Sequence, residues 1–199
     1  AFSTIRDTEV EETMLGYVRP IFKAAGLVPE NAEVVIINDP SINAFVAGGQ
    51  TIFVHTGLIM KAKSVDELVF VLSHETGHIV GGHIVRGYQE MKKAQTTALI
   101  STVLGGVMAV AAGEPDAGIA VMMGGQSSVM GMFAHYRQTE ESAADRIAAG
   151  IIQKLDYSMS GFEGIMKTLS AEERLNSSGE SYLRTHPMTQ TRVSDLQRF

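Results

Sequence analysis

Apolar residues recur at helical spacing in two segments of the N-terminal half and predict two amphipathic helices. The first covers residues 7–26, and Asp7 is placed to cap its first turn. The second opens at Ser64, which together with Glu67 matches a capping box. Its apolar spacing continues to about Arg86. We therefore expect two helices that each bury one face.

Between these helices, shorter apolar runs predict strands. Residues 33–38 form a run typical of a buried strand. Two further runs, 43–47 and 51–55, flank a Gly48-Gly49-Gln50 turn and together predict a β-hairpin. A small sheet of about three strands should therefore pack against the second helix.

The C-terminal part of the chain returns to helical patterns. Residues 137–155 and 160–173 each show apolar residues at helical spacing. Asn176-Ser-Ser-Gly179 is typical of a loop, and a short last helix should begin at Thr189. The fold class predicted from the whole pattern is α+β, mostly helical with a small sheet.

Two uncharged runs, 94–113 and 117–136, flank the short link Glu114-Pro115-Asp116. Each run has 20 residues, which is long enough to span a bilayer. Gly and Ala dominate both runs, however, and the polar stretch 124–128 lies at the centre of the second, which disfavours transfer into lipid. We expect a Met- and Gly-rich helical hairpin that covers a cleft or touches a membrane surface, in preference to a transmembrane pair.

Composition narrows the classes of function. With 199 residues the chain suits a single domain, 1–199, that carries the apolar hairpin as an insertion at about 94–136. The net charge of −6 argues against binding nucleic acid, which needs a basic surface. Cysteine is absent, so a metal site must be built from His, Asp and Glu.

The segment His74-Glu75-Thr76-Gly77-His78 falls within the second predicted helix. Its two histidines are four residues apart and share one face, so both imidazoles can bind one zinc ion. Glu75 lies beside that face and can act as general base toward a metal-bound water. The pattern predicts a zinc-dependent peptidase with one Zn²⁺ per chain; the alternative is a helix that carries these residues by chance.

A catalytic zinc needs a third protein ligand, and Glu141 is the preferred candidate. Asp145 is four residues further on, where it can accept a hydrogen bond from a motif histidine and fix its orientation. Glu140 competes with Glu141, but Ala144 follows it at the same spacing and can orient nothing. His83 is a weaker candidate, because a continuous helix would rotate it away from the ligand face.

His186 precedes Pro187 in a loop-like stretch, and Arg192 follows six residues later. A donor imidazole at His186 could stabilise the oxyanion of a tetrahedral intermediate, with help from Arg192. His186 could instead occupy the open metal position and hold an enzyme inactive, or be a loop residue without a role. The sequence leaves these three readings open.

Taken together, these residues resemble the zinc metallopeptidases of the CAAX prenyl protease and HtpX family, with a HExxH motif of the gluzincin kind, and within it the periplasmic BepA-like branch. The resemblance rests on the order and spacing of Asn43–Gly49, Thr56–Leu58, Glu67–His83, Arg137–Asp145 and His186–Arg192. Two departures are Thr76, where the family usually has Leu, and the lack of tetratricopeptide repeats after the peptidase domain. The resemblance implies a zincin-like fold.

The resemblance also implies roles for individual residues. It makes His74, His78 and Glu141 the zinc ligands, Glu75 the base and Asp145 their support, and it places His186 and Arg192 near the oxyanion or in a loop over the cleft. It implies that an edge strand binds extended substrate, and the candidates are Asn43, Ala44, Phe45, Val46 and Ala47.

The function implied is a metalloendopeptidase of the periplasm that acts on unfolded or misassembled proteins in envelope protein quality control. The expected association with a membrane is a peripheral contact through residues 94–136. The alternative is a self-inhibited, chaperone-like binder of misfolded or outer-membrane proteins, with its zinc site capped by His186.

Overall fold

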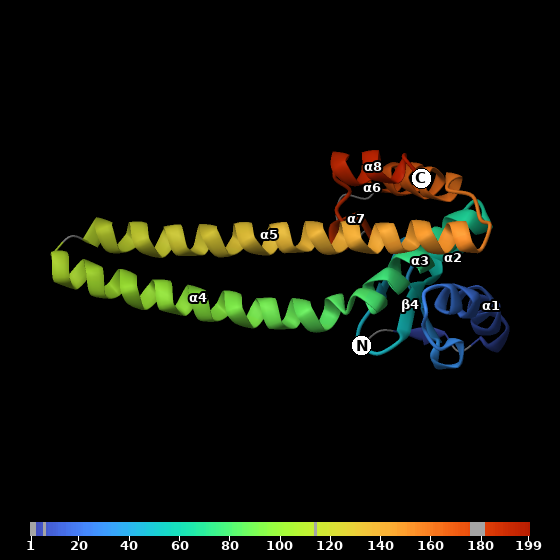
Figure 1. The fold of residues 1–199 in the computed structure, drawn as a ribbon, viewed down its shortest axis with the longest axis horizontal. Helices are drawn as coiled ribbons and strands as arrows, with labels where there is room; N and C mark the ends of the chain where they lie inside the picture. The colour runs from blue at the N-terminus through green and yellow to red at the C-terminus, as the bar shows by residue number, and fades with distance from the viewer. Residues whose placement is uncertain (1–2, 6, 114, 176–181) are drawn as a thin grey trace. The chain divides into compact units, whose positions relative to one another are not determined.

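The computed structural model describes residues 3–5, 7–113, 115–175 and 182–199. The chain divides into two compact units, one formed by Ala1–Gly82 with Glu141–Phe199 and the other by His83–Glu140. We call them the catalytic unit and the hairpin unit. The predicted α+β class is confirmed, because helices dominate and the strands form one small mixed sheet (Figure 1).

The catalytic unit contains β1 (Thr4–Ile5), α1 (Thr8–Ala24), the 3-10 turn η1 (Pro29–Asn31), β2 (Glu33–Ile37), β3 (Ala44–Val46), β4 (Thr51–His55), α2 (Thr56–Lys61), α3 (Val65–Gly81), the end of α5 (Pro115–Lys154), α6 (Ser160–Leu175), α7 (Tyr182–Thr185) and α8 (Gln190–Leu196). The hairpin unit contains α4 (His83–Ala112) and the first part of α5. The loop predicted at 176–179 lies outside the described residues.

The sheet has the strand order β1-β2-β4-β3. Strands β3 and β4 pair antiparallel, as the hairpin prediction required, and the rings of Phe45 and Phe53 stack across them at 5.0 Å. Strand β2 runs parallel to β4. The short strand β1 was not predicted, because two residues carry no measurable alternation. Strand β3 lies at one edge of the sheet.

Side-chain caps fix where the first two long helices begin. Asp7 accepts hydrogen bonds from the backbone of the first turn of α1, as predicted. Ser64 accepts one from Glu67 N at 3.3 Å, whereas the Glu67 carboxylate accepts from Lys63 N at 3.0 Å, one residue earlier than a capping box requires.

The expectation that this second helix reaches about Arg86 is wrong. Helix α3 ends at Gly81, because Gly82 adopts φ 61°, a left-handed conformation that glycine reaches without strain and that closes a helix. A new helix, α4, begins at once with His83.

Helix α3 is the centre of the catalytic unit. It contacts α1, the edge strand β3 and α6, so side chains from Glu67 to His78 are buried on all sides of the helix. Apolar neighbours such as Leu72, Ile152 and Leu169 fill the surrounding core. The polar motif therefore lies on a rigid element, surrounded by packed side chains.

In the hairpin unit, α4 and α5 run side by side in opposite directions and meet near Gly113, whose φ of 62° again suits glycine (Figure 1). Helix α5 is continuous for 40 residues, so the helix predicted to start at residue 137 is the end of a longer one. The assignment of 94–136 as an insertion in a single domain stays a prediction.

Candidate metal centre

Helix α3 places the two motif histidines one turn apart. Their Nε2 atoms lie 3.1 Å from each other, and both side chains are buried. Glu75 is fully buried beside them. The side-chain arrangement expected of a His-Glu-x-x-His helix is therefore present, with two imidazole nitrogens directed at one point.

Glu141 approaches the same point from α5. Its Oε2 lies 3.2 Å from His74 Nε2, and its Oε1 lies 3.5 Å from His78 Nε2. Gly77 allows this approach, because a Cβ on it would lie 2.8 Å from both the Cα and the carbonyl oxygen of Ala144. The glycine within the motif thus has a local reason: α5 passes directly over it.

His186 completes the cluster. It follows α7, and its Nδ1 lies 3.0 Å from Glu141 Oε1 and 3.3 Å from His74 Nε2. One ligand atom from each of these three residues and His78 lies within 4.8 Å of the others. Three imidazole nitrogens and a carboxylate, without thiolate, are a donor set that suits zinc.

Two further observations show that the site fits a metal. Glu75 Oε2 and His186 Nε2 are buried and have no hydrogen-bond partner among the described residues. Buried polar atoms normally have one, so their exceptions mark a place where a missing group belongs. The fit supports a metal here, and the four clustered side chains are those that could hold it.

Asp145 and Arg192 lie behind the cluster. Asp145 Oδ1 is 2.9 Å from His74 Nδ1, the nitrogen on the far side of the ring from the cluster. Arg192 is buried and holds the same carboxylate with two donors, Nε to Oδ2 at 2.6 Å and Nη2 to Oδ1 at 2.9 Å. Its Nη1 also lies 3.0 Å from Glu141 Oε2 and donates to Pro187 O at 2.8 Å. These contacts favour a positioning role for Arg192, whereas its role toward an oxyanion stays a prediction.

The buried charges shift one another's pKa values. Burial lowers the pKa of His74, but hydrogen bonds to Asp145 and Glu141 outweigh this and raise it to about 9. Burial raises the pKa of Glu141, yet its contacts with His186 and His74 bring it well below its usual value. Asp145 follows the same pattern, and Arg192 and His74 lower its pKa. In the metal-free protein a proton on His74 therefore stands where the positive charge of a metal would be.

Glu75 has the opposite behaviour. Burial raises its pKa, and the nearby charges of His186 and His74 only partly reverse the rise. A raised pKa suits a group that must take up and release a proton near neutral pH.

Tyr182 is a member of the site that the sequence analysis missed. Its hydroxyl donates to Glu75 Oε1 at 3.1 Å, and its ring centroid lies 4.5 Å from that of His186. Burial and the nearby Glu75 raise the pKa of this hydroxyl well above its usual value, which keeps it a hydrogen-bond donor. The sequence signal that could have found Tyr182 is its position four residues before His186, because two residues at that spacing share one face of a helix.

The remaining candidates lie elsewhere. The described cluster includes neither His83 nor Glu140, whose carboxylate accepts a hydrogen bond from Tyr136 in the hairpin unit. His55 Nδ1 lies 2.9 Å from Ser41 Oγ, a local contact between loop and strand. Of the predicted substrate strand, Ala44–Val46 form β3, while Asn43 is buried just before it and Ala47 is exposed just after.

Comparison with known proteins supports the interpretation of the His-Glu cluster as the metal site of a peptidase. The model of peptidase family M48 matches residues 5–199. A putative beta-barrel assembly-enhancing protease of Vibrio cholerae is 28% identical over 160 residues, 80% of this chain and 33% of that protein. The beta-barrel assembly-enhancing protease of Escherichia coli K12 is 25% identical over 162 residues, which cover 81% of this chain and 33% of the relative.

A more distant relative is the mitochondrial metalloendopeptidase OMA1 of Schizosaccharomyces pombe, 24% identical over 186 residues, 92% of this chain and 50% of its own length. The chain thus spans about a third of the bacterial relatives it matches. Since the family model covers nearly the whole chain and the buried His-Glu cluster suits a metal, the chain belongs to peptidase family M48.

Proposed function

We propose that this chain is a zinc metalloendopeptidase in which His74, His78 and Glu141 hold the metal. The observation that carries the proposal is the buried meeting of these three side chains with His186, all within 4.8 Å. When bound there, zinc would act as a Lewis acid and lower the pKa of a coordinated water.

Glu75 is the proposed general base. Its carboxylate is buried, its pKa is raised, and Tyr182 holds only one of its oxygens, which leaves Oε2 to meet a reacting proton. It would take a proton from the attacking water and give it to the leaving amine. Tyr182 fixes the direction of the carboxylate and so acts as a positioning residue.

Asp145 and Arg192 are proposed to hold the ligands in place. Asp145 accepts from His74 Nδ1 and thereby directs Nε2 toward the cluster. Arg192 fixes Asp145 with two donors and also reaches Glu141, so one cation positions two carboxylates.

His186 separates the two candidate functions. Its imidazole lies among the proposed ligands, 3.4 Å from Glu75 through Nε2. In an active enzyme His186 would move toward substrate and stabilise the oxyanion. In a self-inhibited, chaperone-like binder it would stay on the metal as a fourth ligand.

The edge strand β3 is the proposed binding site for substrate. Strand β3 lies at the edge of the sheet, which is where an extended peptide can add as a further strand through main-chain hydrogen bonds. Such pairing selects for an unfolded backbone more than for particular side chains. This preference, and the relatives named as beta-barrel assembly-enhancing proteases, support unfolded or misassembled envelope proteins as substrates and the periplasm as the location.

Casein hydrolysis by the zinc-loaded wild type, Glu75→Gln and His186→Ala tests the proposal. We expect Glu75→Gln to lose about 10²–10⁴-fold in rate while it keeps its zinc. If His186→Ala hydrolyses casein more slowly than the wild type, His186 acts on the oxyanion. If it hydrolyses casein faster, His186 caps the metal site. If all three proteins bind zinc and are equally inert, the peptidase assignment fails.

A further inference from the structure

Small residues line the contact between the two helices of the hairpin unit. A Cβ on Gly105 would lie 2.7 Å from the carbonyl oxygen of Gly118 and 2.4 Å from Cγ of Met122, the large side chain that fills the space left by this glycine, and one on Gly118 would lie 2.6 Å from Ala109 Cβ. Gly125 is similarly close to the side chain of Ser101. The two backbones therefore approach each other more closely than larger side chains would allow.

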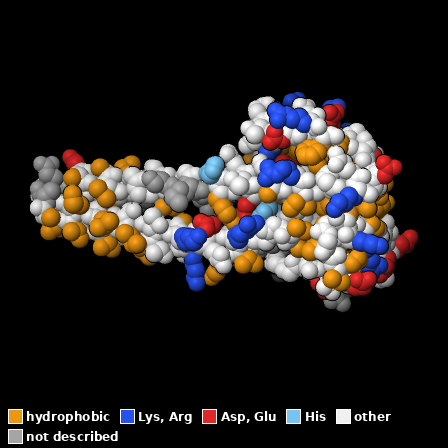
Figure 2. Space-filling model, viewed as in Figure 1, with side chains coloured by type: hydrophobic (Ala, Val, Ile, Leu, Met, Phe, Trp, Pro, Cys, Tyr) orange, Lys and Arg blue, Asp and Glu red, His pale blue; other side chains and the backbone are white. Residues whose placement is uncertain are grey.

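The large apolar side chains of the same helices point outward. Val103 is 64% exposed and Val110 is 85% exposed. Figure 2 shows hydrophobic side chains gathered along this hairpin toward its turn; the exposed ones are Leu99, Ile100, Val103, Leu104, Val107, Met108, Val110, Ile119, Val121, Met123 and Met130. A pair of helices in water would place such side chains between the helices. Small residues inside and large apolar residues outside are the arrangement of helices packed in lipid.

The dimensions of the hairpin agree with a bilayer. The uncharged runs 94–113 and 117–136 have 20 residues each, which as helices extend about 30 Å, the thickness of a hydrocarbon core. Within the described chain, Val85–Ala111 and Asp116–Lys154 are long and apolar enough to cross a membrane, and only 6% and 7% of the most apolar 18-residue window of each is buried.

Three threonine hydroxyl groups of α4 are satisfied within the helix itself. Thr96, Thr97 and Thr102 each donate to the carbonyl four residues earlier, at 3.0, 3.0 and 2.9 Å. Such back-bonding satisfies a hydroxyl without water. Of the polar stretch 124–128 that argued against transfer into lipid, Gly125 faces Ser101 across the helix contact, while Gly124 and Ser127 are exposed.

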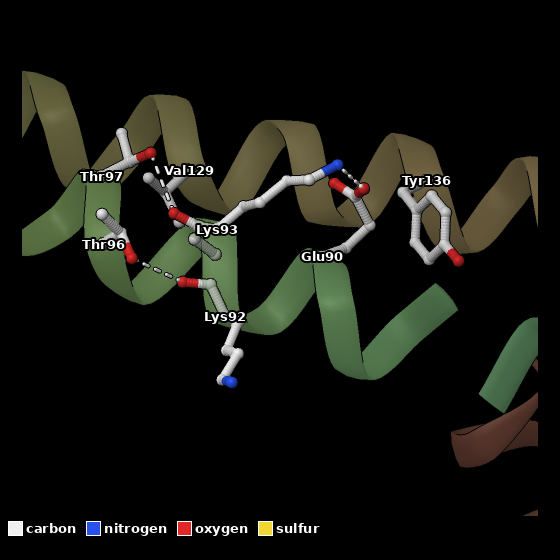
Figure 3. Close-up of a pocket in the computed structure, with 8 residues that line it drawn as sticks. Glu90, Lys92, Lys93, Thr96, Thr97, Val129 and Tyr136 are labelled. Atoms are coloured by element: carbon white, nitrogen blue, oxygen red, sulfur yellow. Dashed lines mark hydrogen bonds and ion pairs between the residues drawn. The ribbon is translucent and has the colours of Figure 1, made fainter. Parts of the chain in front are cut away.

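The end of the hairpin away from the turn is cationic and aromatic. There Lys92 points away from α5 and lies 5.7 Å from the centre of the Tyr88 ring, while Lys93 Nζ lies 2.6 Å from Glu90 (Figure 3). Glu90, Lys92, Lys93 and Tyr136 border a hollow of about 590 Å³, which Val129 also lines. Lysines beside tyrosines, next to an apolar span, match the level of anionic lipid headgroups.

We propose that the hairpin unit inserts across a phospholipid bilayer as a pair of helices, with Lys92, Lys93 and the two tyrosines at the headgroups. The length of the two uncharged runs and the lysines and tyrosines at one end of them favour a lipid bilayer over a second copy of this chain as the occupant of the apolar surface. This inference is independent of the peptidase proposal, because it depends on no residue of the metal centre.

Flotation with vesicles of phosphatidylethanolamine and phosphatidylglycerol in 0.5 M NaCl tests the insertion. The wild type should float, and the double variant Val103→Asp/Val107→Asp should lose at least tenfold of its vesicle-bound fraction. The matched control is Val28→Asp/Met60→Asp, which changes apolar residues of the catalytic unit that are 52% and 82% exposed and should float like the wild type. Equal far-UV circular dichroism shows that all three fold.

Three outcomes overturn the proposal. They are a wild type that stays unbound, a wild type that floats only without salt, and flotation that is unchanged by the two Asp substitutions. If vesicles do not bind and the same substitutions instead dissolve an oligomer in vesicle-free solution, a second copy covers the surface.

The depth of insertion is measured with variants into which one cysteine is introduced for labelling. Because the chain has no cysteine of its own, each variant carries a single label. Bimane at positions 103, 104 and 123, on different outward faces, should be quenched by phospholipids brominated in their acyl chains and shielded from iodide. A hairpin that only lies on the surface would leave at least one of these positions accessible to iodide, which contradicts crossing of the bilayer.

Discussion

In most folded proteins polar side chains are exposed and apolar side chains are buried, and the two units of this chain depart from that distribution in opposite ways. The catalytic unit buries three histidines, three carboxylates and an arginine around one point, whereas the hairpin unit exposes a series of Val, Leu, Ile and Met side chains. Folding in water normally places these groups the other way round. The difference teaches that each exception indicates a partner: a metal for the buried donors and lipid for the exposed apolar surface.

The buried charges are tolerable because each has several partners. Arg192 contacts Asp145 and Glu141, and His74 contacts the same two carboxylates. Such networks are costly to break, because removal of one member leaves the others buried without compensation. The exposed residues of the hairpin unit have no comparable dependence on one another.

The largest effect is expected from Arg192→Ala. It leaves Asp145 and Glu141 without their buried cation and should lower the free energy of unfolding by about 3–5 kcal/mol. Arg198→Ala is the control, because this arginine pairs with Asp195 at the surface and should change stability by less than about 1 kcal/mol. Urea titration measures both, and equal effects of the two substitutions would contradict a buried network.

The next effect concerns pH in the metal-free protein. The pKa of His74 is raised from 6.5 to about 9. The stabilisation of the folded state by protonated His74 is therefore complete below pH 6.5 and is lost as pH rises through 9. We expect a fall of about 3 kcal/mol in the free energy of unfolding over this range. Denaturation in the presence of a chelator measures it. The zinc-loaded protein should not show this fall, and a flat profile without metal would contradict protonation of His74.

Gly77→Ala should have a smaller effect on stability, about 1–3 kcal/mol, together with weaker binding of zinc. The added methyl group meets the backbone of Ala144, so α5 must move away and take Glu141 with it. Gly150→Ala is the matched control, since a Cβ there meets nothing and alanine favours the helix. Thermal unfolding and zinc titration should separate the two variants; similar results would remove the reason given for this glycine.

Tyr182→Phe should give the smallest change, about 1 kcal/mol in stability. Loss of the hydrogen bond to Glu75 removes an influence that lowers the pKa of this carboxyl group, so the acid limb of kcat/KM should move to higher pH. The pH profile of casein hydrolysis measures the shift. An unchanged profile would show that Tyr182 does not position the base.

Much of the catalytic unit could be predicted from local patterns. Periodicity located α1, α3 and the hairpin of β3 and β4, and the His-Glu-x-x-His spacing indicated where two imidazoles meet. Glu141 was a reasoned candidate because Asp145 shares its helical face. These features depend on residues close together in sequence.

The meeting of Glu141 and Asp145 with the motif histidines was predicted although these residues are distant in sequence, but other contacts between distant residues were not. The contact of Tyr182 with Glu75 joins residues 107 positions apart, and the two-donor grip of Arg192 on Asp145 joins residues 47 apart. The end of α3 depended on whether one glycine would adopt a left-handed conformation, which composition alone does not decide. In the hairpin unit, the inward direction of the small residues appears only when both helices are paired.

Zinc content is the most direct test of the central claim, that His74, His78 and Glu141 hold a catalytic metal. Mass spectrometry of the native protein should find one zinc per chain in the wild type and in Glu75→Gln, and much less than one in Glu141→Gln. Zinc retained by Glu141→Gln but lost from Glu75→Gln would contradict the assigned roles of the two glutamates. Less than stoichiometric zinc in the wild type, after purification without chelators and with zinc supplied, would contradict the metal centre itself.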